Sequence, residues 1–172
     1  MATKKEKEVA DREAIKGTGP FEPPIRLNLG SGLRKKEGYV NIDNREEMEP
    51  DLLCDVLNGL PFEDNSVEEV FCQDFLEHIP RENVITVITD IWRVLRPGGK
   101  FEHITPSTDG RGAFQDPHHV SFWNKNSWYY YTHPAYRRLY GIEAKFDVGY
   151  LEDHTEDVEV VYTHGVMYAS KD

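Results

Sequence analysis

The chain has 172 residues, of which 38% are hydrophobic and 30% charged, and its formal net charge is −11. This length suits one domain with a buried core and is too short for a catalytic domain plus a separate substrate domain. No apolar run approaches the roughly 20 residues that a membrane span needs, and the excess of acidic residues argues against duplex nucleic acid as a partner. We therefore expect binding to neither a membrane nor duplex nucleic acid.

The first part of the chain differs in composition from the rest. Residues 1–24 carry Lys and Glu in a loose helical pattern, then glycines and prolines that interrupt any regular element, so we predict a flexible N-terminal tail and linker. This part lacks the apolar stretch of a secretory signal, so the expected location is cytoplasmic. Residues 25–172 are predicted to form a single domain.

Short apolar or alternating segments, each ended by a turn or a polar residue, predict strands. They cover residues 25–29, 39–43, 52–56, 67–72 and 100–105, with closing strands expected within 144–148, 158–162 and 165–168. Apolar residues at three- and four-residue intervals predict a helix over 81–95, ended by Pro97-Gly98-Gly99. We therefore predict an α/β fold, a doubly wound and mostly parallel Rossmann-like sheet with helices on both faces and an antiparallel closing strand. Such sheets bind ligands at the carboxyl ends of their strands.

The first predicted strand runs directly into Gly30-Ser31-Gly32. Glycines at a tight turn let the backbone approach a bound cofactor closely, although the same pattern is also an ordinary turn. A dinucleotide fingerprint requires a third glycine where this chain has Lys35, which disfavours NAD.

Two carboxylates end the next two predicted strands. Asp43 stands where an acidic side chain of a doubly wound fold accepts hydrogen bonds from the hydroxyls of an adenosine ribose. Asp55, followed by Val56, stands where a carboxylate and a backbone amide suit the amino group and ring nitrogen of an adenine. Each residue alone fits a surface turn equally well, but their order at one edge of one sheet favours a shared cofactor site.

At this point the sequence resembles the class I S-adenosylmethionine-dependent methyltransferases, in particular the small type-11-like domain. The matching pieces, spread over about residues 25–106, read LNLGSG, GYVNID, DVLNGLPF, DNSVEEVFCQDFLEHI and RVLRPGG. The resemblance implies that S-adenosylmethionine is the cofactor and that its methyl group is transferred by direct displacement. Two positions depart from the family pattern, which often has an acid where Asn28 stands and a further glycine where Arg34 stands.

The resemblance also implies roles for individual residues. Gly30, Ser31, Gly32, Gln73 and Asp74 are expected near the methionine part, and Asp43 on the ribose. Asp55, Val56 and Asn44 are expected beside the adenine, and Asn28 remains able to contact the cofactor through its amide oxygen. The pair Glu77-His78 recurs in this family beside the fourth strand, where a histidine is more often structural.

The segment after the fifth strand contains the other chemically active residues. Asp116-Pro117-His118-His119 precedes the aromatic residues Phe122, Trp123, Trp128, Tyr129, Tyr130 and Tyr131, in the part of the chain where the family builds its acceptor pocket. These rings suit either an acceptor pocket or a core under a loop. His118, His119 and Asp74 are the candidate general bases. We expect no metal site, because Asp116, His118 and His119 lack a separate fixed partner ligand.

The sequence thus predicts an enzyme that methylates an unidentified acceptor. The short chain after the fifth strand favours a small molecule over a large substrate. Two alternatives stay open: a module that binds S-adenosylmethionine or S-adenosylhomocysteine without catalysis, and a Rossmann-like enzyme that uses another adenosine-containing cofactor.

Overall fold

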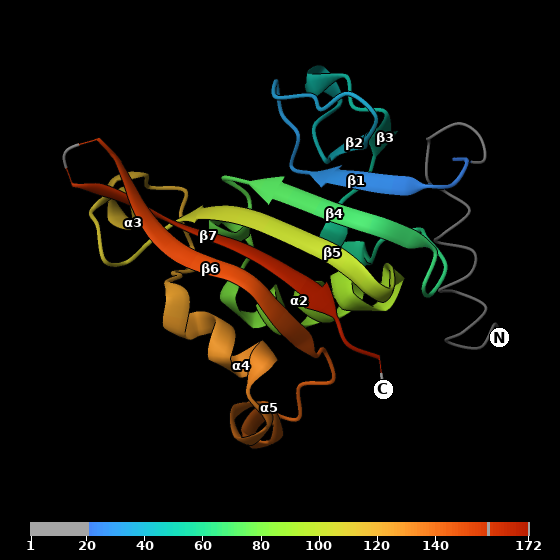
Figure 1. Ribbon diagram of the computed structural model, residues 1–172. Coiled ribbons are helices and arrows are strands. Elements are labelled where there is room, and N and C mark those ends of the chain that lie inside the picture. Colours follow the sequence, from blue (N-terminus) through green and yellow to red (C-terminus); the bar gives the residue numbers. More distant parts are fainter. Residues whose placement is uncertain (1–20, 158, 172) are drawn as a thin grey trace, which may run out of the picture.

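The computed structural model describes residues 21–157 and 159–171 (Figure 1). Most of the predicted N-terminal tail lies outside the described residues; residues 21–24 contain neither helix nor strand, and Phe21 packs against Phe62 with ring centroids 5.9 Å apart. No helix of the described part is long and apolar enough to cross a membrane.

The described residues form one seven-stranded sheet in the order β3-β2-β1-β4-β5-β7-β6. The strands are β1 (Ile25–Leu29), β2 (Val40–Asp43), β3 (Leu52–Leu53), β4 (Val67–Gln73), β5 (Leu95–Pro106), β6 (Phe146–Asp157) and β7 (Val160–Ala169). β1 to β5 pair in parallel, and β7 runs antiparallel to both of its neighbours. The mostly parallel Rossmann-like sheet and its antiparallel closing strand are thus confirmed.

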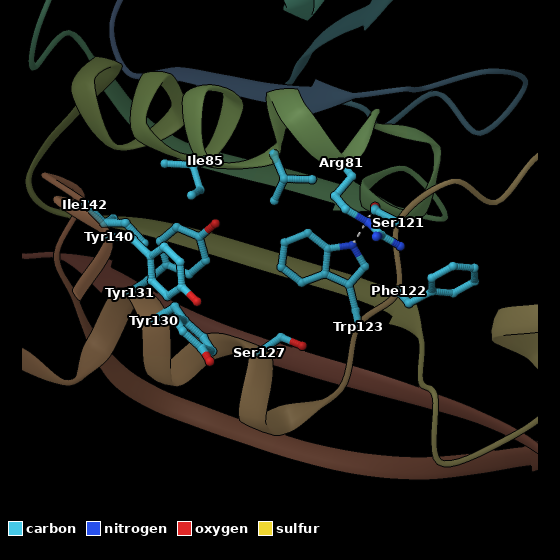
Figure 2. Close-up of a pocket in the computed structure, with 11 residues that line it drawn as sticks. Arg81, Ile85, Ser121, Phe122, Trp123, Ser127, Tyr130, Tyr131, Tyr140 and Ile142 are labelled. Carbon is cyan, nitrogen blue, oxygen red and sulfur yellow. Dashed lines mark hydrogen bonds between the residues drawn. The ribbon is translucent and has the colours of Figure 1, made fainter. Parts of the chain in front are cut away.

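The helical elements are α2 (Val84–Val94), α3 (Gly112–Gln115), α4 (Tyr129–Thr132) and α5 (Pro134–Tyr140). Short 3-10 helices are η1 (Glu46–Met48), η2 (Val56–Asn58), η3 (Leu76–His78), η4 (Arg81–Asn83) and η5 (Lys125–Trp128). The described connections from β1 to β2 and from β2 to β3 contain no α-helix. The first contains three glycines, and the second contains only the short helix η1. α2 and α4 lie on the same face of the sheet, where residues from both line one cavity (Figure 2).

Several element boundaries differ from the sequence prediction. The third strand is shorter than expected, because Asp55 caps η2 by accepting a hydrogen bond from the Leu57 N–H. β5 begins at Leu95, earlier than expected, and the predicted strand segments at 158–162 and 165–168 merge into β7. α4 and α5 were not expected, because their run of tyrosines lacks helical periodicity of apolar and polar residues.

The core lies between the sheet and α2, whose residues Val87, Ile88, Ile91 and Val94 are buried. Towards β6 and β7 the core is aromatic. Trp128 is fully buried, and the ring of His103 on β5 stacks on the Trp128 ring with the ring centroids 4.1 Å apart. Burial in this setting lowers the pKa of His103 to about 3, with a smaller contribution from His164. His103 is therefore a neutral core residue at physiological pH.

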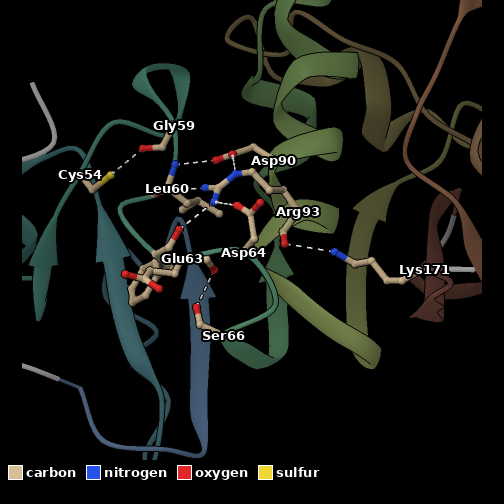
Figure 3. A network of polar contacts seen from close by, with 10 residues as sticks. Cys54, Gly59, Leu60, Glu63, Asp64, Ser66, Asp90, Arg93 and Lys171 are labelled. Carbon is tan, nitrogen blue, oxygen red and sulfur yellow. Dashed lines mark hydrogen bonds and ion pairs between the residues drawn. The ribbon is translucent and has the colours of Figure 1, made fainter. Parts of the chain in front are cut away.

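A polar network around Arg93 of α2 fixes the chain that follows η2 (Figure 3). The guanidinium donates hydrogen bonds to the carbonyl oxygens of Leu60 and Phe62 and to the carboxylates of Asp64 and Asp90. Asp90 in turn accepts a hydrogen bond from the Leu60 N–H. Because this segment directly follows Asp55 and Val56, the network anchors the chain beside the predicted adenine position.

Candidate cofactor site

A cavity of about 470 Å³ lies at the carboxyl ends of β1, β2 and β4. Of the residues predicted from sequence, it is lined by Gly30, Asp43, Asn44, Asp55, Val56, Asp74 and His118. They come together because parallel neighbouring strands end at the same edge of the sheet, so the loops that follow them share one space.

The loop after β1 needs glycine for two separate reasons. Gly30 has φ +62° and Gly32 has φ +47°, in the left-handed region that side chains disfavour. In addition, a Cβ at Gly30 would overlap the ring of Phe75, which comes from the loop after β4. The backbone of Gly30 therefore forms part of the cavity wall, directly against Phe75.

Asp43 is buried and ends β2. Its Oδ2 accepts a hydrogen bond from the Gly32 N–H at 2.9 Å, and its Oδ1 accepts from the backbone N–H and the Nε of Arg45 at 3.0 and 3.2 Å. Although burial opposes ionisation, the hydrogen bonds from Arg45 and Gly32 hold the pKa of Asp43 below its usual value. The cavity thus contains a fixed carboxylate that can accept further hydrogen bonds from hydroxyl groups.

Four predicted cofactor residues do not line this cavity: Asn28, Ser31, Gly32 and Gln73. Asn28 is buried, and its amide donates to the Arg34 carbonyl at 3.0 Å and to Asn41 Oδ1 at 2.9 Å. Ser31 is also buried, and its N–H donates to the Ile42 carbonyl at 3.0 Å. In this structure Asn28 and Ser31 hold the loop between β1 and β2 in place.

Asp74 follows β4, lines the cavity and has φ +49°. Its carboxylate pairs with the guanidinium of Arg34 at 2.6 Å, which joins the loop after β1 to the loop after β4. Arg34 is one of the two positions that depart from the family pattern, and its side chain provides a contact that a glycine lacks.

The two histidines predicted as bases lie in different surroundings. The side chain of His118 is 83% exposed and lines the cavity, and its Nδ1 lies 3.0 Å from Asp116 Oδ1. His119 is 7% exposed and does not line the cavity; its Nδ1 lies 3.0 Å from the carbonyl oxygen of Ala113. His78, which the sequence suggested as structural, does line the cavity.

Sequence reasoning missed several residues of the cavity wall. They are Ile42, Arg45, Cys54, Leu57, Phe75, Ile79 and Pro80. Arg45 and Phe75 follow the predicted carboxylates Asp43 and Asp74 within two residues, and this position after a strand end is the signal that could have found them. The apolar side chains had no such signal, because core and cavity residues look alike in sequence.

A second cavity of about 490 Å³ lies between α2 and α4 (Figure 2). Predicted aromatic residues line it: Phe122, Trp123, Tyr130 and Tyr131, with Arg81 and Ser121 at one end. Trp128 is instead buried in the core. Pro80 lines the first cavity and Arg81 the second, so adjacent residues of one turn contribute to both cavities.

This strand order, with a glycine loop after β1 and a carboxylate at the end of β2 beside one cavity, is a Rossmann-like arrangement. Residues 34–102 match the model of the family described as a methyltransferase domain. This match covers part of the chain and agrees with the resemblance found in the sequence.

Solved structures similar to this chain include an S-adenosylmethionine-dependent methyltransferase from Methanosarcina mazei, with 15% identity, a TM-score of 0.60, and 91% of this chain and 100% of that chain covered. The 1,6-didemethyltoxoflavin-N1-methyltransferase of Burkholderia thailandensis, solved with S-adenosylhomocysteine, has 15% identity and a TM-score of 0.58, over 87% of this chain and 72% of that one. The [4+2]-cyclase SpnF has 14% identity and a TM-score of 0.63, over 100% of this chain and 84% of that one. These likenesses show the fold. No curated protein matches the chain.

Proposed function

We propose that this protein is an enzyme that binds S-adenosylmethionine in the cavity at the carboxyl ends of β1, β2 and β4 and methylates a small molecule. The observation that carries the proposal is the contact between Asp43, which lines the cavity, and the glycine loop: the buried carboxylate of Asp43 accepts a hydrogen bond from the backbone N–H of Gly32. A ribose-binding acid and a glycine loop whose backbone can come close to the ligand are what an adenosine cofactor with a flexible tail requires.

The residues that line the cavity fit this cofactor. Asp43 would accept hydrogen bonds from the ribose hydroxyls, and Asn44, Asp55 and Val56 would lie beside the adenine. Gly30 and Asp74 would lie at the methionine end, where Phe75 already fills the space that a side chain at Gly30 would need. When bound, S-adenosylmethionine supplies an electrophilic methyl group, and the protein supplies orientation and exclusion of water.

Among the candidate bases, the geometry favours His118. Because the Asp116 carboxylate can only accept, His118 Nδ1 donates to it, which leaves Nε2 of the neutral ring able to take a proton. Asp116 is held in its ionised form, since two hydrogen bonds from His118 lower the pKa of its carboxyl group. Asp74 is the second candidate, and its carboxylate is already paired with the guanidinium of Arg34.

The second cavity is the proposed acceptor site. Its volume suits a small molecule, and its walls are mainly aromatic and aliphatic with a few polar groups, a composition typical of small-molecule sites. It shares one turn of the chain with the cofactor cavity, because Pro80 lines one cavity and Arg81 the other. We expect a planar or largely apolar acceptor that stacks on Trp123 and Tyr130.

Calorimetry with S-adenosylmethionine, S-adenosylhomocysteine and NAD tests the cofactor. We expect the first two to bind and NAD not to bind; binding of NAD alone would support another adenosine-containing cofactor instead. Incubation with methyl-labelled S-adenosylmethionine and a cell extract then tests transfer. Label in a small-molecule fraction supports the proposal, whereas cofactor binding without any labelled product would indicate a non-catalytic binding module.

A variant of the second cavity tests the acceptor site separately. Replacing Tyr130 with Ala should lower the labelling rate about tenfold or more and leave the affinity for S-adenosylhomocysteine unchanged. Tyr168→Ala is the matched control, because Tyr168 is an exposed tyrosine on β7 that lines neither cavity. Equal labelling by both variants would exclude this cavity as the acceptor site.

A further inference from the structure

Three side chains that the proposed methyl transfer does not use form a cluster beside the cofactor cavity. One carboxylate oxygen of Glu77 and one ring nitrogen each of His78 and His119 lie within 4.8 Å of one another. Glu77 and His78 belong to η3, directly after β4, and His119 comes from the loop after α3. The backbone joins these segments, because the N–H groups of Val120 and Ser121 both donate to the Glu77 carbonyl, at 2.8 and 3.0 Å.

The carboxylate of Glu77 is incompletely paired. The residue is 1% exposed, and its Oε2 accepts a hydrogen bond from the Thr105 hydroxyl at 2.8 Å. Its Oε1 is buried and has no hydrogen-bond partner among the described residues. A buried carboxylate oxygen without a partner is costly, so such groups are normally hydrogen-bonded, paired with a cation or bound to a metal. The cluster contains an oxygen of this kind next to two imidazole rings.

Both histidines present the ring nitrogen that a metal needs. His78 Nδ1 lies 3.3 Å from the carbonyl oxygen of His118, and His119 Nδ1 lies 3.0 Å from the carbonyl oxygen of Ala113. A carbonyl only accepts, so each Nδ1 carries the hydrogen, and Nε2 of each neutral ring keeps its lone pair. Histidines that bind metals show this same arrangement, with the second ring nitrogen donating to a backbone carbonyl or carboxylate.

We propose that Glu77, His78 and His119 bind one divalent transition-metal ion, through Nε2 of each histidine and a carboxylate oxygen of Glu77. Two imidazoles and a carboxylate are a ligand set suited to Zn²⁺, and three protein ligands leave a coordination position open for water or another small molecule. Bonds of about 2.1 Å require the ligand atoms to draw together, which the exposed His78 can accommodate by rotation.

The position of this site relates it to the cofactor cavity without depending on methyl transfer. His78 lines the cavity, so the ion would lie at the cavity wall. The structure also supplies what the segment Asp116 to His119 lacks in sequence, a fixed partner ligand, since Glu77 is buried and belongs to a separate element. Asp116 Oδ2 lies 3.8 Å from His119 Nε2, too far for a hydrogen bond.

Metal binding is tested on the full chain after removal of metals with a chelator. Titration with Zn²⁺ in a calorimeter should show one equivalent bound, and Co²⁺ should give visible absorption bands of a protein-bound ion. Zn²⁺ should also raise the temperature of thermal unfolding, because a ligand that binds the folded state stabilises it. Absence of binding in the wild-type protein would overturn the proposal, whether or not S-adenosylmethionine binds.

Variants then locate the ligands. His119→Gln and His78→Gln should each weaken Zn²⁺ binding about tenfold or more. His118→Gln is the matched control, because it changes the adjacent histidine of the same loop and should leave the affinity unchanged. Circular dichroism of the metal-free proteins verifies folding, and we avoid Glu77 variants as sole evidence because this side chain is buried. Unchanged affinity in His119→Gln, or an equal loss in His118→Gln, would overturn the assignment of the ligands.

Discussion

The carboxylate of Asp43 accepts a hydrogen bond at 2.9 Å from the backbone N–H of Gly32, so the end of β2 holds the glycine loop that follows β1. The second oxygen is held by Arg45 through its backbone N–H and its Nε. The proposed ribose carboxylate and the proposed methionine loop are therefore joined directly, and a change to Asp43 should affect both.

Replacing Asp43 with Asn should weaken binding of S-adenosylmethionine about ten- to hundredfold. The amide has one acceptor oxygen in place of two, and its NH₂ group would face the donors of Gly32 or Arg45. Calorimetry measures the affinity, and thermal unfolding reports how much of the loss comes from a destabilised loop. Asp147→Asn on β6 is the control, since Asp147 is exposed on the opposite edge strand of the sheet and should bind as the wild type does. Unchanged affinity in Asp43→Asn would exclude the ribose role.

A methyl group at Gly30 should obstruct the cofactor cavity. In Gly30→Ala the new Cβ overlaps the Phe75 ring, which must then move, and both residues line the cavity. We expect loss of S-adenosylhomocysteine affinity by about tenfold or more, together with a loss of stability from the positive φ of about 1–2 kcal/mol.

Gly38→Ala separates the clash from the backbone strain. Gly38 also has a positive φ, of +78°, but among the described residues beyond its chain neighbours no atom lies within 4 Å of the position of its missing Cβ. This variant should lose a similar amount of stability and keep its cofactor affinity. If both variants bind equally well, contact between Gly30 and Phe75 does not shape the site. Recovery of affinity in Gly30→Ala combined with Phe75→Ala would identify the displaced ring as the obstruction.

The sequence predicted the strands because their alternation of residues is local, and it predicted their shared edge because parallel strands end together. Gly30, Asp43, Asp55 and Asp74 meet in one cavity for that reason. Asn28 and Gln73 lie near the same edge but do not line the cavity. Whether a residue at a strand end reaches the cavity depends on its hydrogen bonds to neighbouring loops, and no pattern within one strand shows these.

Helix α5 and the contacts between distant parts of the chain were harder to predict from the sequence. α5 begins with Pro134 and is followed by Gly141 in the left-handed conformation, two local signals that could have predicted it despite its lack of periodicity. In contrast, the approach of His119 to Glu77 and His78 joins parts of the chain about 40 residues apart through hydrogen bonds to the Glu77 carbonyl. Spacing in sequence does not indicate such a contact.

Arg93→Lys should destabilise the protein by about 2–3 kcal/mol. The guanidinium donates four hydrogen bonds, to the carbonyl oxygens of Leu60 and Phe62 and to the carboxylates of Asp64 and Asp90 (Figure 3). The single ammonium group of lysine cannot reproduce the planar arrangement of these donors. Urea unfolding measures the change. Arg96→Lys is the control, because Arg96 forms an exposed ion pair with Glu68 and its replacement should change stability by less than about 0.5 kcal/mol. Equal effects of the two substitutions would mean that the network contributes little.

His103 should make the protein less stable as the pH falls from 7 to 5. Burial, with a smaller effect of His164, lowers its pKa in the folded state to about 3, whereas in the unfolded chain its pKa is near the ordinary value of 6.5. Between these values the unfolded chain binds a proton that the folded protein excludes, so acid favours unfolding. This residue alone should remove about 2 kcal/mol of the free energy of unfolding between pH 7 and pH 5.

The variant His103→Leu lacks the titrating group, so its free energy of unfolding should fall by about 2 kcal/mol less than that of the wild type over the same pH range. Urea unfolding at pH 5 and pH 7, followed by tryptophan fluorescence, measures both proteins. The comparison does not depend on the stability of the variant at pH 7, which also reflects the lost stacking on Trp128. Because carboxylates elsewhere titrate equally in both proteins, their contribution cancels in the difference. An identical pH dependence of the two proteins would show that His103 takes up its proton in the folded state.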